Sequence, residues 1–202
     1  MKTKLNLLVS LVMLLATLTV GTSWAQIDPA WLASWRIAEQ QQPAIITSTG
    51  RIAPENQSGT PLAIFGLVTS PEGKPEGGVL VHAYHTDELG LELGDADHPR
   101  STWKYQRWVR TDEDGQFHLQ TIRPLPERGG KSGAHVHFTL VSDKYGRQRA
   151  PTAFLGDDPL VTDDQRQRSK AFGRFGSVRE VRTEFGAQYI NVNLRLKELA
   201  DF

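Results

Sequence analysis

Residues 108–122, WVRTDEDGQFHLQTI, contain two strand-like segments separated by a turn. The first segment, Trp108 to Thr111, combines aromatic and β-branched residues, and in the second, Gln116 to Ile122, polar and apolar residues alternate. Both compositions favour β-strands, because every second side chain of a strand points to the same face. The intervening Asp112-Glu113-Asp114-Gly115 has the carboxylates and the glycine that favour a tight turn. The stretch therefore predicts a β protein.

The same pattern of short strands and turns extends outward over most of the chain. Turn residues recur at Ser70-Pro71-Glu72-Gly73 and at Asp143-Lys144-Tyr145-Gly146. Further strands are predicted at Leu62 to Thr69, Val79 to Tyr84, His135 to Val141 and Gln188 to Leu196. Short strands at this spacing predict a mainly β fold, an antiparallel β-sandwich.

Two helices are expected beside the sandwich. Asp28-Pro29 begins a short N-terminal helix, since aspartate is a favoured N-cap and proline is tolerated in the first turn. This helix should end by Pro43, and we assign it with its polar connection to residues 26–60 and the sandwich domain to residues 61–202. A second short helix is expected from Asp163 to Ala171, where it would cover one edge or one mouth of the sandwich.

Residues 1–25 have the pattern of a signal peptide. Lys2 and Lys4 precede an apolar run from Leu5 to Val20, and Ser23-Trp24-Ala25 provides small residues at the −3 and −1 positions of a cleavage site. The alternative is an uncleaved membrane anchor, but the run is short for one. We therefore expect a protein that is exported to the periplasm or secreted, with no membrane attachment after cleavage.

The composition restricts the partners and the metal ligands. Lysine plus arginine and aspartate plus glutamate both number 23, and loss of the two leader lysines would move the formal net charge from 0 to −2. This balance gives no reason to expect a nucleic acid or an anionic membrane as a partner. The chain has no cysteine, so any metal must be held by histidine, tyrosine, aspartate or glutamate. The oligomeric state is open, and a homo-oligomer is compatible with the sequence.

The six histidines all fall between residues 82 and 137, and two of them are separated by a single residue. His135 and His137 would lie on one face of a strand, so both imidazoles could reach one metal ion, while Val136 and Phe138 would pack on the other face. By itself, such a pair is also typical of an exposed or hydrogen-bonded cross-strand feature. Its interpretation therefore depends on the rest of the sequence.

Several motifs occur in an order and at a spacing that are typical of one family. They are Gly66-Leu67-Val68 with Gly73-Lys74-Pro75, Val79-Leu80-Val81-His82-Ala83-Tyr84-His85-Thr86-Asp87, Thr111-Asp112-Glu113-Asp114-Gly115-Gln116-Phe117, Thr121-Ile122-Arg123-Pro124, His135-Val136-His137, and Phe154-Leu155-Gly156-Asp157-Asp158-Pro159-Leu160. In this ordered set the chain resembles the intradiol ring-cleavage dioxygenases. The resemblance implies a β-sandwich and a non-haem iron enzyme.

The resemblance also implies a metal site. Members of this family hold a ferric ion with two tyrosines and two histidines, and they insert both atoms of dioxygen between the hydroxyl-bearing carbons of a catechol. The resemblance places the two histidine ligands at His135 and His137. Neither tyrosine position matches, because Gly90 is followed by Leu91 where the first tyrosine is expected, and Glu127 stands at the second position.

Glu127 and Tyr105 are the candidates for the missing anionic oxygen ligand. With His135 and His137, Glu127 would form a two-histidine, one-carboxylate face, an arrangement that suits ferrous iron. Tyr105 would supply a displaced phenolate if its loop were rearranged. Each also has a purely structural interpretation, Glu127 as a solvated loop carboxylate beside Arg128 and Tyr105 as a strand-edge aromatic residue.

Two functions are compatible with these residues. The first is a non-haem iron dioxygenase that oxidises a catechol-like aromatic diol with dioxygen. The alternative is a catalytically inactive dioxygenase scaffold that binds an aromatic, carbohydrate or protein partner, since the fold alone does not decide function. Among the remaining candidates, Tyr84 is expected to pack with a hydrogen-bonded hydroxyl, and His98 and His118 are expected at the surface.

Overall fold

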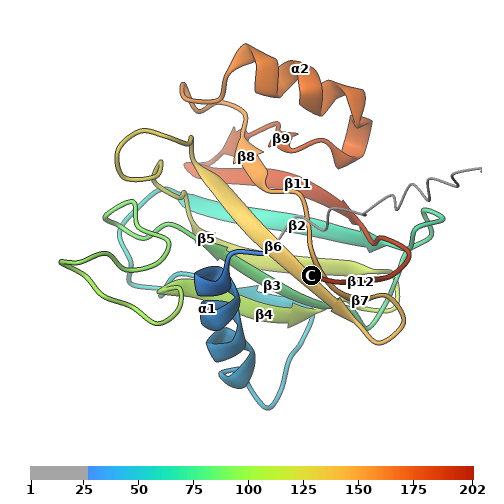
Figure 1. The fold of residues 1–202 in the computed structure, drawn as a ribbon. Helices are drawn as coiled ribbons and strands as arrows, with labels where there is room; N and C mark the ends of the chain where they lie inside the picture. Colours follow the sequence, from blue (N-terminus) through green and yellow to red (C-terminus); the bar gives the residue numbers. More distant parts are fainter. Residues whose placement is uncertain (1–26) are drawn as a thin grey trace, which may run out of the picture.

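The computed structural model describes residues 27–202. The predicted signal peptide, residues 1–25, and its cleavage site lie outside the described residues. Two β-sheets pack against each other, and two short helices lie at the periphery (Figure 1). Neither of these helices is long and apolar enough to cross a membrane.

The first sheet has five strands in the order β1-β5-β2-β11-β10. Their bounds are β1 Thr49–Arg51, β5 Gln116–Ile122, β2 Pro61–Thr69, β11 Ala187–Arg195 and β10 Arg182–Glu184. In β5 every second residue is buried, and the residues between them are exposed or half-buried. One face of this sheet therefore points to the core. His118 lies on the other face, stacked on the exposed Phe65, and His98 is exposed, as predicted.

The second sheet has the main order β12-β7-β6-β3-β4, and beside this path β8 pairs with β6 and with β9. The bounds are β12 Ala200–Asp201, β7 Gly146–Arg149, β6 His135–Ser142, β3 Leu80–His85, β4 Tyr105–Arg110, β8 Ala153–Leu155 and β9 Val178–Arg179. The predicted mainly β sandwich is confirmed, but both sheets are mixed, because β1, β11, β12 and β9 pair in parallel with β5, β2, β7 and β8. Two strands that pair in parallel are connected by a long stretch of chain, so local sequence patterns do not reveal that they pair.

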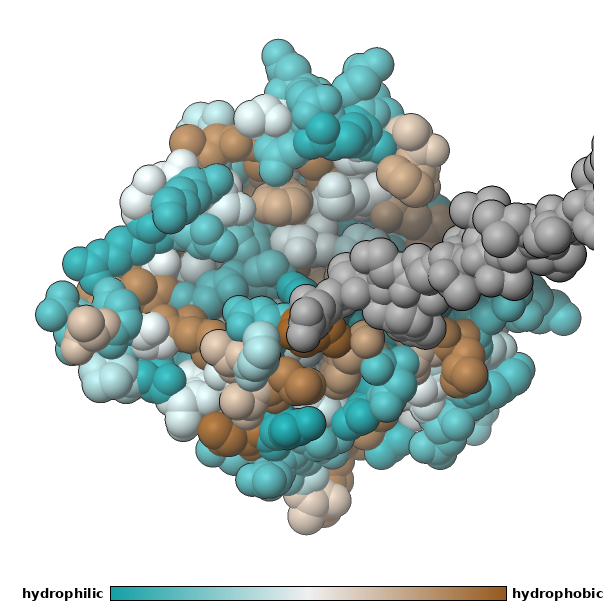
Figure 2. Space-filling view, in the orientation of Figure 1, coloured by the Kyte–Doolittle hydropathy of each residue, from teal (hydrophilic) through white to brown (hydrophobic). Residues whose placement is uncertain are grey.

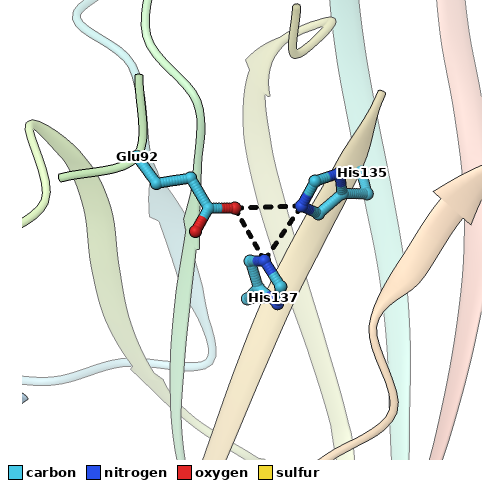
Figure 3. Close-up of side chains that lie close together, drawn as sticks. All are labelled: Glu92, His135 and His137. Carbon is cyan, nitrogen blue, oxygen red and sulfur yellow. Dashed lines mark hydrogen bonds and ion pairs between the residues drawn. The ribbon is translucent and has the colours of Figure 1, made fainter. Parts of the chain in front are cut away.

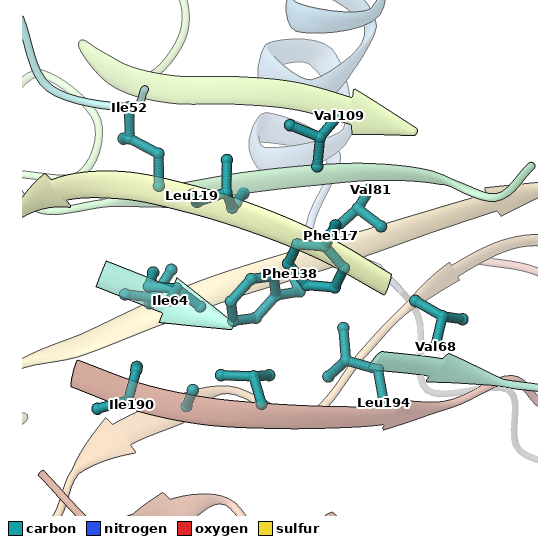
Figure 4. Close-up of a cluster of buried hydrophobic side chains, with 14 of the residues drawn as sticks. Ile52, Ile64, Val68, Val81, Val109, Phe117, Leu119, Phe138, Ile190 and Leu194 are labelled. Atoms are coloured by element: carbon teal, nitrogen blue, oxygen red, sulfur yellow. The ribbon is translucent and has the colours of Figure 1, made fainter. Parts of the chain in front are cut away.

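The hydrophobic core lies between the two sheets (Figure 4). Phe117 of β5 and Phe138 of β6 meet there, with ring centroids 6.1 Å apart. Val136 and Phe138 belong to this core, as predicted. Because neighbouring residues of a strand point to opposite faces, His135 and His137 lie on the outer face of β6.

Helix α1, Pro29–Gln40, covers part of that outer face. Asp28 caps the helix by accepting a hydrogen bond from the N–H of Ala30, as predicted. Trp31 and Trp35 are buried against the sheet, and the indole N–H of Trp31 donates to the hydroxyl of Tyr84 over 2.8 Å. The predicted packing role of Tyr84, with a hydrogen-bonded hydroxyl, is therefore confirmed.

The second predicted helix is also present. Helix α2, Asp163–Ala171, begins with a capping box between Thr162 and Gln165, and the short 3-10 helix η1, Gly173–Phe175, follows it. In Figure 1, α2 lies at the top of the molecule, beyond β8 and β9.

Candidate metal centre

The imidazoles of His135 and His137 point away from the core, toward the segment that follows β3 (Figure 3). Their Nε2 atoms lie 2.9 Å apart, and the two rings are nearly perpendicular, at 87°. The two imidazoles therefore converge on one point, as the periodicity of the strand predicts.

A third side chain, Glu92, completes the cluster. Its Oε1 lies 2.6 Å from Nε2 of His137 and 2.9 Å from Nε2 of His135. Burial alone would raise the pKa of Glu92, but hydrogen bonds to His135 and His137, and their charges, lower it to about 2. Glu92 therefore places an ionised carboxylate oxygen against two imidazole nitrogens.

The other ring nitrogen of each histidine has its own partner. Nδ1 of His135 lies 2.6 Å from the carbonyl oxygen of Gly133, to which it donates. Nδ1 of His137 lies 3.0 Å from Oγ1 of Thr152. Hydrogen bonds of this kind fix the tautomer and the ring orientation of metal-binding histidines. They leave both Nε2 atoms facing Glu92.

Aromatic side chains hold the two imidazoles from the sides. Tyr84 of β3 stands opposite His137 in the strand register, and the two rings stack with centroids 4.9 Å apart. The ring of Phe154 of β8 lies 5.2 Å from that of His135. This packing limits rotation of the imidazoles and reduces their contact with water.

The segment that carries Glu92 is shaped by a turn. Asp87 accepts hydrogen bonds from the N–H groups of Leu89 and Leu91 and pairs with Arg100. Gly90 has a φ of +71°, and a Cβ atom there would lie 2.7 Å from the carbonyl oxygen of Pro126. Only glycine fits this turn without strain. The close approach brings the segments of Glu92 and Glu127 together.

The geometry of the cluster fits a metal ion. Three ligand atoms on one face of an octahedral ion, each about 2.1 Å from it, lie about 3 Å from one another. The three separations here are 2.6, 2.9 and 2.9 Å. Two imidazoles and one carboxylate form the facial set that suits ferrous iron and leaves the other coordination positions open.

The sequence candidates for the anionic ligand lie farther from the histidines. Oε1 of Glu127 is 3.9 Å from Nε2 of His135, and the Glu127 side chain is 36% exposed. The hydroxyl of Tyr105 donates to Glu88 over 2.7 Å, and burial raises the pKa of this hydroxyl. Metal binding by His135, His137, Glu127 or Tyr105 stays a prediction.

The sequence alone does not single out Glu92 as a site residue. The family resemblance places the first tyrosine position at Leu91, and Glu92 is the next residue. A carboxylate between two leucines, Leu91 and Leu93, is the signal that could have identified it, because a charged residue in an apolar stretch needs a partner when it is buried.

Comparisons with known proteins agree with the fold. A protein-family model described as Dioxygenase matches residues 36–192. Catechol 1,2-dioxygenase 1 of Acinetobacter lwoffii is 32% identical over 131 residues, which are 56% of this chain and 41% of that protein. The chain therefore spans less than half the length of this relative.

Solved structures show the same architecture at lower identity. Catechol 1,2-dioxygenase of Acinetobacter radioresistens superimposes with a TM-score of 0.56 at 22% identity, over 78% of this chain and 60% of that chain. The dioxygenase domain of a dioxygenase carbohydrate-binding protein fusion from Streptomyces sp. SirexAA-E gives a TM-score of 0.53 at 19% identity, over 79% of this chain and 96% of that chain.

Proposed function

The chain belongs to the intradiol dioxygenase family, and we propose that it is a non-haem iron dioxygenase that oxidises a catechol-like aromatic diol with dioxygen. The observation that carries the proposal is the facial arrangement of Glu92, His135 and His137, whose ligand atoms lie within 2.9 Å of one another. The catechol 1,2-dioxygenases among its relatives suggest the substrate class.

In this proposal the three side chains hold the iron, and Glu92 replaces a family phenolate. A bound iron would supply open coordination positions and the redox chemistry that bring the diol and dioxygen together. One carboxylate and two neutral imidazoles suit the ferrous state better than the ferric state, which phenolates stabilise in the family. Thr152 and Gly133 keep the imidazole Nε2 atoms directed at the ion.

Glu127 has a separate role in this proposal. A diol must lose a hydroxyl proton to bind as a good ligand, and a carboxylate close to the metal ligands can accept that proton. Oε1 of Glu127 lies 3.9 Å from Nε2 of His135. This distance is longer than the separations among the ligand atoms of Glu92, His135 and His137, but it leaves Glu127 next to that cluster. We assign proton acceptance to this oxygen.

A matched pair of variants tests the assignment. Glu92→Gln and Glu127→Gln each remove one charge while keeping the side-chain shape. We expect Glu92→Gln to lower the retained iron about tenfold or more after loading with ferrous iron under anaerobic conditions and dialysis. Glu127→Gln should retain iron near the wild-type level but consume oxygen more slowly with catechol. Circular dichroism and the thermal midpoint of each iron-free variant check the fold.

Two outcomes would contradict the proposal. If Glu92→Gln retains iron as well as the wild-type protein does, the facial site is wrong. If the wild-type protein retains iron but consumes no oxygen with a panel of aromatic diols, the dioxygenase activity is wrong and an inactive binding scaffold becomes the better account.

We also propose that this chemistry takes place outside the cytoplasm. The support is the signal-peptide pattern of residues 1–25. Mass spectrometry of the exported protein should find an N-terminus near Gln26. Exported material that retains Met1 would contradict a cleaved leader.

A further inference from the structure

The tryptophans of the chain gather at one place, on the outer face of the second sheet. Trp24 lies in the predicted leader, and the others belong to one buried cluster that also holds Tyr84: Trp31, Trp35, Trp103 and Trp108. Residues 26–202 contain no cysteine and no methionine, because the two methionines of the chain are Met1 and Met13. In the absence of sulfur side chains, tryptophan and tyrosine are the most easily oxidised side chains of this part of the protein.

Tyr84 connects this cluster to the candidate metal centre. Its ring stacks on that of His137, with centroids 4.9 Å apart. It also stacks on the indole of Trp103, with centroids 4.0 Å apart, and its hydroxyl accepts the hydrogen bond from Trp31. The rings of Trp31 and Trp103 lie 6.1 Å from each other. A continuous series of aromatic contacts therefore runs from a histidine of the candidate site to two tryptophans.

The series comes nearest to solvent at Trp31. This residue is 8% exposed, whereas Tyr84 and Trp103 are each 2% exposed. In Figure 1, the helix that carries Trp31, α1, lies in the lower part of the molecule, and Figure 2 shows hydrophobic and hydrophilic residues mixed there. A small molecule in solution can therefore contact Trp31 more readily than the rings behind it.

Packing alone does not account for the choice of side chains in this cluster. Leucine or phenylalanine can also fill an apolar interface between a helix and a sheet. The indole N–H groups of Trp35 and Trp103 are buried and have no hydrogen-bond partner among residues 27–202. Because a buried donor without a partner lowers stability, these indoles carry a cost that a purely apolar side chain would avoid.

We propose that Tyr84, Trp103 and Trp31 form an electron-transfer path that protects the metal centre from oxidation. The path rests on the proposed iron site. Its oxidant is hydrogen peroxide, which takes up two electrons and two protons at the iron and yields two molecules of water. In the absence of a diol, Trp103 and Trp31 supply the electrons one at a time across the ring of Tyr84. A small reductant such as ascorbate, which gives up two electrons and two protons, restores the indoles at Trp31.

Mapping the oxidised residues by peptide mass spectrometry tests the path. The purified protein is loaded with ferrous iron and treated with hydrogen peroxide without a diol, and the zinc-loaded protein is the reference, because zinc has no redox chemistry. We expect the iron form to add oxygen at Trp103 and Trp31 and the zinc form to remain largely unmodified. Ascorbate should suppress this oxidation, because it reduces the indoles before they react further.

A double variant removes both electron donors that contact Tyr84. Trp31→Phe combined with Trp103→Phe keeps aromatic rings in both places, but phenylalanine is much harder to oxidise. We expect oxidation of the peptide that carries His135 and His137 to rise several-fold, because these imidazoles are then the nearest oxidisable groups. Circular dichroism and the thermal midpoint check the fold.

Trp108→Phe is the matched control. Trp108 belongs to the same cluster, but its ring packs on those of His82 and Trp35, farther along the series from His137. Its loss should leave the oxidation of the histidine peptide at the wild-type level. If the double variant does not fold, Trp103→Phe alone takes its place in the comparison with Trp108→Phe.

Two results would overturn the path. One is equal oxidation of the histidine peptide in the double variant and in Trp108→Phe. The other is wild-type oxidation confined to exposed side chains such as Phe172 and Phe185, which radicals in solution reach first. Iron retention is measured separately, so a protein that retains iron but gives either result loses only the path. A protein that retains no iron loses both the path and the proposed function.

Discussion

The hydroxyl oxygen of Thr152 lies 3.0 Å from Nδ1 of His137. Thr152 stands just before β8, whereas His137 is on β6, so a residue outside the strand of His137 helps to orient this imidazole. The hydroxyl oxygen can accept a hydrogen bond from the Nδ1–H of His137, which keeps the lone pair of Nε2 directed toward Glu92.

Loss of the Thr152 hydroxyl should weaken metal binding without disrupting the fold. We expect Thr152→Val, which keeps the side-chain shape, to raise the dissociation constant for ferrous iron about tenfold. Thr152→Ser retains the hydroxyl and should bind iron nearly as the wild-type protein does. Competition with a chelator measures both constants. Equal affinities for the two variants would contradict a role for this hydroxyl.

Colour should reveal which position supplies the anionic ligand of the proposed iron site. A phenolate bound to ferric iron absorbs visible light, and a carboxylate in its place does not. We expect Glu92→Tyr, loaded with ferric iron, to develop a visible band, because its side chain starts from the segment that reaches both histidines. Glu127→Tyr should give a weaker band or none, since Glu127 lies 3.9 Å from His135. A band in Glu127→Tyr alone would assign the anionic ligand to position 127.

His82 should make the protein sensitive to mild acid. It is fully buried, stacked on Trp108, and burial lowers its pKa to about 4 from an ordinary value of 6.5. At a pH between about 4 and 6.5, His82 binds a proton in the unfolded chain but not in the folded chain. The free energy of unfolding therefore falls as the pH falls through this range. We expect His82 to account for a loss of about 2 kcal/mol between pH 7 and pH 5.

Urea unfolding at both pH values measures this loss. His82→Gln cannot take up a proton, so its free energy of unfolding should change less between pH 7 and pH 5 than that of the wild-type protein. Some dependence should remain, because burial also lowers the pKa of His85 to about 4. An unchanged dependence in His82→Gln would show that His82 is not the acid-sensitive group.

The attachment of α1 to the sheet should depend on Trp35. This side chain is fully buried, and the ring of Phe202 meets its ring edge-on with centroids 4.6 Å apart. We expect Trp35→Ala to lower the free energy of unfolding by about 3–5 kcal/mol, because it leaves a large cavity. Phe172→Ala is the control, since Phe172 is 70% exposed and its loss should cost little. Similar losses in the two variants would contradict a tight α1 interface.

Local patterns in the sequence predicted most of the regular structure. Strand β5 and helix α2 have the predicted bounds, and Asp28 caps α1 as expected. These features depend on residues close together in the chain, through alternating side chains, turn residues and caps. The parallel pairing of β2 with β11 joins segments more than a hundred residues apart, and no local pattern encodes it.

The same distinction applies to the candidate metal centre. The sequence by itself determined that His135 and His137 share one face of a strand, because they are two residues apart and Val136 between them is a core residue. It did not determine which carboxylate meets them. Glu92 lies in a segment without periodicity, and only the tertiary structure places it there, through the turn at Gly90 and the contact of that turn with Pro126. Such a contact depends on how distant segments pack, which neither spacing nor composition specifies.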